Sequence, residues 1–281
     1  MLKQMFKNNP DMAEMSFFDH LEALRWHIVR SFVAILIGMI VVFIKIEFVY
    51  DRIIMAPTRH TFITYKVLCD LGHSLHLGNS LCLPDVPLEF QSMQLSGQFM
   101  QALSSSFTFG AIIAAPYILW EFWRFVKPAL KPEELTYTRG IIFWTSLLFF
   151  TGIGFGYFVI APYTVNFFGA YSISKSIKNL ITIQSYLSTM SQVVVGCGVL
   201  FELPIVTYFL AKVGVITSDF LRKYRRHAFL VILIVAAFIT PPDVASQIIV
   251  TIPLYLLYEL SIWITRRVQR QKAEQDAKEW S

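Results

Sequence analysis

The sequence predicts an all-α membrane protein with six transmembrane helices, and three observations point there. Hydrophobic residues make up 55% of the 281 residues and charged residues only 15%, whereas about 25% is usual in soluble globular proteins. The apolar residues gather into six runs, and the basic residues gather in alternate connections between those runs. A soluble fold with so few charges would expose very large apolar patches. An ordinary cytosolic enzyme and a disordered chain are therefore excluded.

The expected spans follow from the length of each apolar run. A spanning helix needs about 20 mainly apolar residues, because the hydrocarbon core is about 30 Å thick and a helix rises about 1.5 Å per residue. The expected spans are residues 27–48, 103–122, 140–162, 187–210, 228–241 and 244–264. The last two contain uncharged stretches that reach only about 22 Å as helix, so the bilayer is expected to thin beside them.

The basic residues orient the chain, since cytoplasmic connections are rich in Lys and Arg. Most of the 24 Lys and Arg residues precede the first span, follow the second or fourth span, or lie in the tail at residues 265–281. Both termini are therefore expected in the cytoplasm. Residues 49–102 then form a long extracytoplasmic loop of a single integral membrane domain, residues 1–281. The sequence has no basic stripe with interleaved aromatic residues, so no nucleic-acid partner is expected.

Residues 16–26 are expected to form a short amphipathic helix on the cytoplasmic side, before the first span. Apolar residues recur at helical spacing there, which leaves Asp19, Glu22 and Arg25 on another face. A helix that lies on the inner leaflet would explain this pattern without any binding role.

The outer loop contains two of the three cysteines, Cys69 and Cys82. An oxidising compartment permits a disulfide, which would stabilise a loop of this size by roughly 3 kcal/mol. His60, His73 and His76 lie nearby, so a Cys/His metal site is the rival interpretation. Because the spacing fits no familiar zinc pattern, the disulfide is favoured and no metal site is predicted.

Two of the acidic residues in or beside the expected spans carry structural information. Glu202 is inside the fourth span, where an ionised carboxylate is costly unless it is paired, protonated or facing water. Pro204 follows it and should kink that helix, which indicates a polar pocket on a bent helix. A protonated Glu202 bonded to a neighbouring helix is the structural alternative. Asp243 lies in a tight Pro-rich turn, where it would cap the sixth span.

Motifs typical of enzymes are absent from the sequence. It has no HExxH or GxSxG pattern, and no Ser-Lys or paired-Asp arrangement suited to intramembrane proteolysis. Gly152, Gly154 and Gly156 superficially suggest a phosphate loop, but they lie within an apolar run and follow no strand. Close helix packing through Gly152 and Gly156 explains them better. No enzyme activity and no cofactor are expected.

Five segments, in order along nearly the whole chain, resemble the signature segments of the TatC family, the multispanning core of the twin-arginine protein translocase. They are His20-Leu-Glu-Ala-Leu-Arg25, Ala115-Pro-Tyr-Ile-Leu119, Phe125-Val-Lys-Pro-Ala-Leu130, Phe201-Glu-Leu-Pro204 and Thr240-Pro-Pro-Asp-Val-Ala-Ser-Gln247. Each segment is modest alone, but five in register on six spans are highly specific.

The resemblance implies a glove-shaped six-helix fold with a concave face, in the bacterial inner membrane. It implies a Sec-independent translocase subunit that binds twin-arginine signal peptides on the cytoplasmic side. Such a subunit supports export of folded proteins driven by the proton-motive force. Single-span partners of the TatA and TatB type are also implied, as are further copies of the chain in a receptor complex.

In the family, a cytoplasmic acid after the second span contacts the arginine pair. Counting from Phe125 through Leu130 places that acid at Glu134, with Glu133 beside it. Phe125 joins them in the expected signal-peptide site. Guanidinium groups favour bidentate carboxylates, which agrees with this assignment. The alternative is that both acids only cap a helix after Pro132.

A second family acid departs from the pattern. It normally stands directly before Leu-Arg, where this chain has Ala23, and Glu22 precedes it by one residue. That shift rotates a side chain by about 100° on a helix, so Glu22, Asp19 and Arg25 are all retained as candidates for the signal-peptide site. The remaining family positions are expected to be structural or partner-binding: Pro57, Pro116, Pro128, Pro204, Glu202, Asp243 and Gln247.

Two other functions are compatible with the sequence. A proton- or ion-coupled secondary transporter could use Glu202, although the repeated halves typical of such proteins are not apparent. A membrane scaffold without transport activity is the second alternative.

Overall fold

The computed structural model of the chain describes residues 17–59, 61–74, 76, 82, 89–126, 138–174, 179–240 and 244–279, and most of them are helical. Within this part of the chain, five helical stretches are long and apolar enough to cross a membrane. They are Leu21–Ile44, Gly97–Val126, Gly140–Ala170, Ile183–Val213 and Ser246–Glu274. A further apolar helix, α10 (Arg225–Ile239), has only 15 residues. It corresponds to the short fifth span expected from the sequence, so the arrangement is consistent with six spans.

The first helix differs from the expectation at both ends. α1 runs without interruption from Phe17 to Ile44, so the expected amphipathic segment is the beginning of the same helix. The sequence has no Gly or Pro that would end a helix between the two parts. After Lys45 the chain continues through α2 (Ile46–Val49) and a π-helical turn, η1 (Tyr50–Ile54). The first long helix therefore ends at Ile44, four residues before the expected limit of the span at residue 48.

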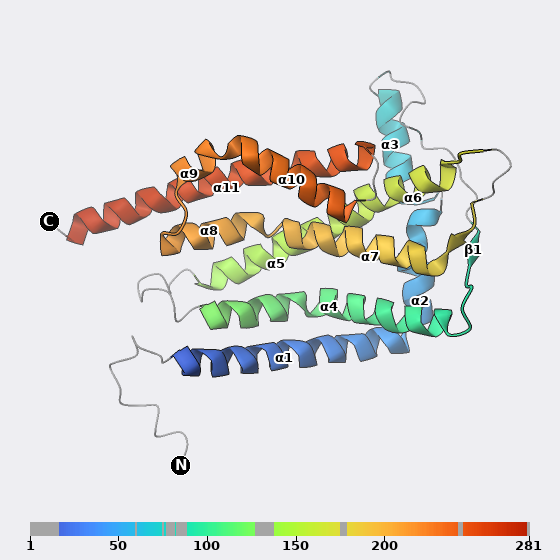
Figure 1. Cartoon of the computed structure of the whole chain (residues 1–281), viewed down its shortest axis with the longest axis horizontal. Coiled ribbons are helices and arrows are strands. Elements are labelled where there is room, and N and C mark those ends of the chain that lie inside the picture. Colours follow the sequence, from blue (N-terminus) through green and yellow to red (C-terminus); the bar gives the residue numbers. More distant parts are fainter. Residues whose placement is uncertain are drawn as a thin grey trace, which may run out of the picture.

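The expected outer loop contains regular structure of its own. It holds a 3-10 turn, η2 (Ala56–Thr58), and a helix, α3 (Ile63–Ser74), which runs across the direction of the long helices and projects to one side of them in Figure 1. A two-residue strand, β1 (Phe90–Gln91), pairs in parallel with β2 (Ile181–Thr182). This small sheet joins the outer loop to the segment before the fourth span and is the one departure from an all-α fold in the described residues.

Three tyrosines attach the outer turns to the helices. The Tyr65 hydroxyl donates to the Pro57 carbonyl at 2.8 Å, and the Tyr157 hydroxyl donates to the Ile53 carbonyl at 2.7 Å. Tyr186 donates in the same way to the carbonyl of Ile54. Burial raises the pKa of the Tyr65 phenol to about 12, so this group keeps its proton and remains a donor at ordinary pH. Pro57 itself is fully buried.

The remaining elements follow in order along the chain. The second span is α4 (Gly97–Val126), and the third is built from α5 (Thr138–Phe155), a π-helical turn η6 (Gly156–Ile160) and α6 (Ala161–Ala170). The fourth consists of α7 (Ile183–Leu200) and α8 (Leu203–Val213). After them come α9 (Ser218–Lys223), α10 and α11 (Val244–Glu279).

The fourth span is interrupted near the predicted kink. α7 ends at Leu200, Phe201 and Glu202 form a turn, and α8 begins with Pro204 in its first turn. A proline is tolerated there because the backbone N–H groups of a first turn have no intrahelical partner.

The expected tail, residues 265–281, is helical as far as Glu279. α11 continues through residue 264 as far as Glu279, since no Gly or Pro follows Pro253. Gln269 accepts a hydrogen bond from the Ser218 backbone N–H at 3.1 Å, and Val268 is buried. The last part of α11 therefore packs on α8 and α9.

The long helices lie alongside one another, and the start of α1 and the end of α11 lie at the same end of the bundle (Figure 1). Glycines lie where some of these helices approach one another closely. A Cβ added to Gly110 of α4 would lie 2.5 Å from the Met39 backbone nitrogen of α1, and one added to Gly152 would lie 2.6 Å from the Cys197 carbonyl oxygen of α7. Gly156 also contacts α7, so the close packing predicted for Gly152 and Gly156 is confirmed.

Candidate functional site

A buried carboxylate joins α1 to α4 near the end of α4. Glu121 is 1% exposed, and its Oε2 lies 2.5 Å from Nδ1 of His27. The Tyr117 hydroxyl donates to Oε1 at 3.0 Å, and Nη1 of Arg124 donates to the same oxygen at 3.3 Å. Nη1 of Arg30 lies 3.9 Å from Oε2. These five residues are called the Glu121 cluster below.

Helical spacing explains how the cluster assembles. Tyr117 and Arg124 stand four residues before and three residues after Glu121, so all three share one face of α4. His27 and Arg30 are three residues apart and share the facing side of α1. The two guanidinium groups remain 45% and 47% exposed while the carboxylate between them is buried. A negative charge at the interface is thus surrounded by donors from both helices.

Aromatic rings border this cluster. The Phe125 ring meets the His27 imidazole edge to face, with the ring centroids 6.1 Å apart. The guanidinium carbon of Arg124 lies 4.8 Å from the Trp120 ring centroid. Phe125, which was predicted to help bind a signal peptide, therefore lies at the junction of α1 and α4.

Sequence reasoning missed Glu121, which is the second-to-last residue of the expected span 103–122 and belongs to none of the motifs from which the candidates were chosen. Its partner His27 is 94 residues away, and no local pattern relates residues at that separation. The available signal was the matching helical spacing of Tyr117, Glu121 and Arg124, with basic side chains on the first helix to face them.

Glu202 occupies the turn between α7 and α8. Its Oε1 is buried and has no hydrogen-bond partner among the described residues. Gln247 lies at the contact between α11 and α10, where its Nε2 donates to the Leu233 carbonyl at 3.2 Å. Pro204, in the first turn of α8, is fully buried. Glu202 thus lies where the helix is broken, with one carboxyl oxygen buried and without a hydrogen-bond partner among the described residues.

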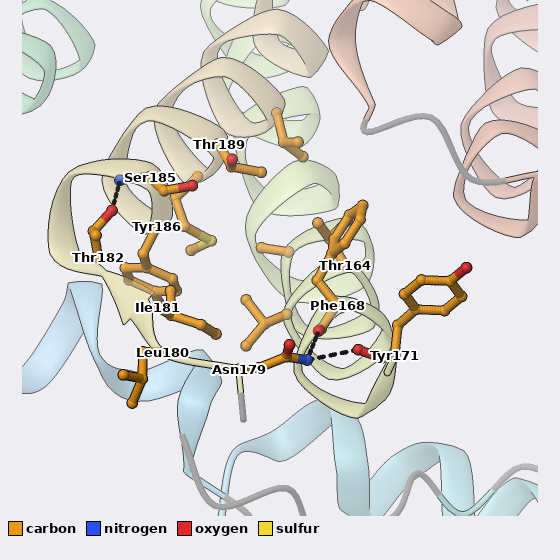
Figure 2. Close-up of a pocket in the computed structure, with 14 residues that line it drawn as sticks. Thr164, Phe168, Tyr171, Asn179, Leu180, Ile181, Thr182, Ser185, Tyr186 and Thr189 are labelled. Carbon is orange, nitrogen blue, oxygen red and sulfur yellow. Dashed lines mark hydrogen bonds between the residues drawn. The ribbon is translucent and has the colours of Figure 1, made fainter. Parts of the chain in front are cut away.

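A cavity of about 550 Å³ lies between α6 and the start of α7, as Figure 2 shows. Its wall is apolar with a rim of hydroxyl and amide groups, and none of the residues that line it is charged. The Asn179 amide donates to the Phe168 and Tyr171 carbonyls and closes one side. No residue predicted from the sequence to be functional lines this cavity.

In the outer loop, Cys69 of α3 and Cys82 form a disulfide, with their Cα atoms 4.3 Å apart. Cys197 is buried and is not disulfide-bonded.

Comparison with known proteins places the chain in a family. The family model for "Sec-independent protein translocase protein (TatC)" matches residues 19–253. A TatC from a Blattabacterium species of Periplaneta americana is 40% identical over 92% of this chain and 98% of its own length. A TatC from Halalkalibacterium halodurans is 34% identical over 92% of each chain. The chain belongs to the TatC family.

Solved structures agree with this TatC assignment. A crystal structure of the twin-arginine translocase receptor TatC in DDM superposes with a TM-score of 0.70 and 29% sequence identity, covering 88% of this chain and 99% of that one. A second crystal structure of that receptor gives a TM-score of 0.66 over 89% of this chain. The chain is therefore a multispan membrane protein of the Sec-independent translocase type.

The TatC signature residues fall into three groups in the structure. Glu22 and Arg25 lie exposed on the first turns of α1, and Pro116 lies within α4. Glu133, Glu134, Pro128 and Asp243 lie outside the described residues, as does the side chain of Asp19. The structure brings Phe125 to the Glu121 cluster, whereas Glu202 and Gln247 contribute to different contacts.

Proposed function

We propose that this TatC protein is the receptor subunit for signal peptides with consecutive arginines, on the cytoplasmic side of the bacterial inner membrane. Glu134 and Glu133 bind the arginine pair, and Glu22 and Asp19 supply further negative charge from α1. Arg25 and Phe125 border the same surface. Folded cargo is then exported with TatA- and TatB-type single-span partners, driven by the proton-motive force.

The Glu121 cluster is the observation that supports this proposal most directly. It ties α1, which carries Asp19 and Glu22, to the end of α4, which leads into Glu133 and Glu134. The cluster thereby holds the first turns of α1 next to the end of α4. Bidentate recognition of guanidinium groups requires such fixed geometry.

Crosslinking tests the proposal directly. Membranes containing the protein are incubated with a signal peptide that carries a photoreactive group beside Arg-Arg, and with the same peptide carrying Lys-Lys. The Arg-Arg peptide should be captured preferentially, because Lys offers no bidentate fork. Equal capture of the two peptides would contradict the receptor function.

Replacing Glu134 locates the site. Glu134→Ala should lower capture of the Arg-Arg peptide while the protein stays in the membrane at its normal level. Glu274→Ala, which removes an exposed acid near the end of α11, is the matched control and should leave capture unchanged. Undiminished capture by Glu134→Ala would place the arginine site elsewhere.

We further propose that Glu202 takes a polar group from a single-span partner. Its Oε1 is buried without a partner in the described residues, and a buried carboxyl oxygen gains from a donor. Glu202→Gln retains one acceptor oxygen and should retain co-purification with a TatA- or TatB-type partner better than Glu202→Leu. Loss of signal-peptide capture with normal partner co-purification would contradict this role.

A further inference from the structure

The outer loop contains a group of metal-ligating side chains that signal recognition does not use. The sulfur atoms of Cys69 and Cys82 and a ring nitrogen of His73 all lie within 4.8 Å of one another. They come from α3 and from a segment thirteen residues further along the chain at Cys82. The disulfide is therefore accompanied by a third potential ligand in the described part of this loop.

Helix geometry accounts for the position of the histidine. Cys69 and His73 are four residues apart on α3 (Ile63–Ser74), so they share one face of the helix. The side chain of His73 is exposed, and a metal ion from the surrounding solution would have access to it. Two sulfurs and one imidazole nitrogen are a ligand set typical of Zn²⁺, which leaves a fourth tetrahedral position for water.

We propose that Cys69, His73 and Cys82 form a thiol-dependent Zn²⁺ site, which exists only when the disulfide is reduced. Reduction by a dithiol or a phosphine adds two electrons and two protons to the disulfide and gives two thiols, while the reductant is oxidised. Zn²⁺ then binds both sulfurs as thiolates and releases the two protons. In the oxidised protein the sulfur atoms are bonded to each other, so the two states exclude one another. This site is independent of the signal-peptide function.

The purified full chain in detergent tests this with Co²⁺ as a spectroscopic substitute for Zn²⁺. The phosphine-reduced protein, without oxygen, should develop thiolate-to-cobalt charge-transfer bands and the visible bands of tetrahedral Co²⁺. One equivalent of Zn²⁺ should remove them, and the oxidised protein should show none. His73→Ala should weaken Co²⁺ binding at least about tenfold, since loss of a second-shell partner alone costs about 10–100-fold.

Two variants serve as controls. The double variant Cys69→Ser with Cys82→Ser retains the buried thiol of Cys197 and should show no bands. His76→Ala removes a neighbouring exposed histidine outside the group and should bind as the parent does.

Three results would overturn the proposal. The first is a reduced parent protein with no more absorbance than the double-serine variant. The second is equal affinity of His73→Ala and the parent. The third is loss of helical circular dichroism upon reduction, because the spacing of Cys69 and His73 depends on α3.

Discussion

Glu121 illustrates how one residue can hold two membrane helices in register. A carboxylate buried to 1% exposure would be costly alone. Here Oε2 has its donors from α1 and Oε1 has its donors from α4. The stability of this contact depends on the set being complete. Removing one partner leaves the others buried or partly buried without a counterpart, which costs more than the intact contact contributes.

Glu121→Gln should therefore lower the stability of the detergent-purified protein by about 1–3 kcal/mol, the usual penalty for unpaired buried donors. The amide replaces one acceptor oxygen by a donor that faces His27 or the guanidinium groups. A shift of the thermal transition, followed by tryptophan fluorescence or size-exclusion elution after heating, measures the loss.

The matched control for Glu121→Gln is Glu259→Gln. Glu259 pairs with Arg225 at 2.6 Å, but the two side chains are 32% and 45% exposed. Exposed pairs contribute about 0–1 kcal/mol, so this variant should remain close to the parent. If both variants lost the same amount of stability, the burial of Glu121 would not explain the loss.

At the scale of helices, the sequence was informative about which segments are apolar and uninformative about where helices end. The membrane-length runs and the break at Glu202 and Pro204 follow from local chemistry, namely hydropathy and a missing N–H. α1 and α11 extend past the expected limits because a polar residue ends a span without ending a helix. The contact of Glu121 with His27 could not be predicted, since it depends on how two distant helices pack.

Helix packing at Gly110 can be tested by adding one methyl group. In Gly110→Ala the new Cβ would lie 2.5 Å from the Met39 backbone nitrogen, so α1 and α4 must separate. Overpacking of this kind costs about 1–3 kcal/mol, visible as a lower thermal transition.

Gly154→Ala is the control for this change, since a Cβ there meets no atom within 4 Å. It should be neutral or slightly stabilising, because Ala favours helix over Gly. A loss in Gly154→Ala as large as in Gly110→Ala would argue against packing as the cause.

For the whole molecule, the common location of the start of α1 and the end of α11 (Figure 1) requires an even number of crossings between them. Five long apolar stretches alone would place those ends on opposite sides of the membrane. We therefore predict that α10 is a sixth crossing, although its 15 residues reach only about 22 Å. A local thinning of the bilayer beside α10 allows this at modest cost.

Cysteine labelling tests this topology in a Cys69→Ser and Cys82→Ser background, where the remaining Cys197 is buried. Leu95→Cys, at a fully exposed position between β1 and α4, should react with a membrane-impermeant maleimide in intact spheroplasts. Lys272→Cys, exposed near the end of α11, should react only after lysis. Reaction of Lys272→Cys in intact spheroplasts would place the C-terminal end of α11 on the outer side of the membrane and would contradict this topology. The chain would then cross the membrane five times, and α10 would lie within one leaflet.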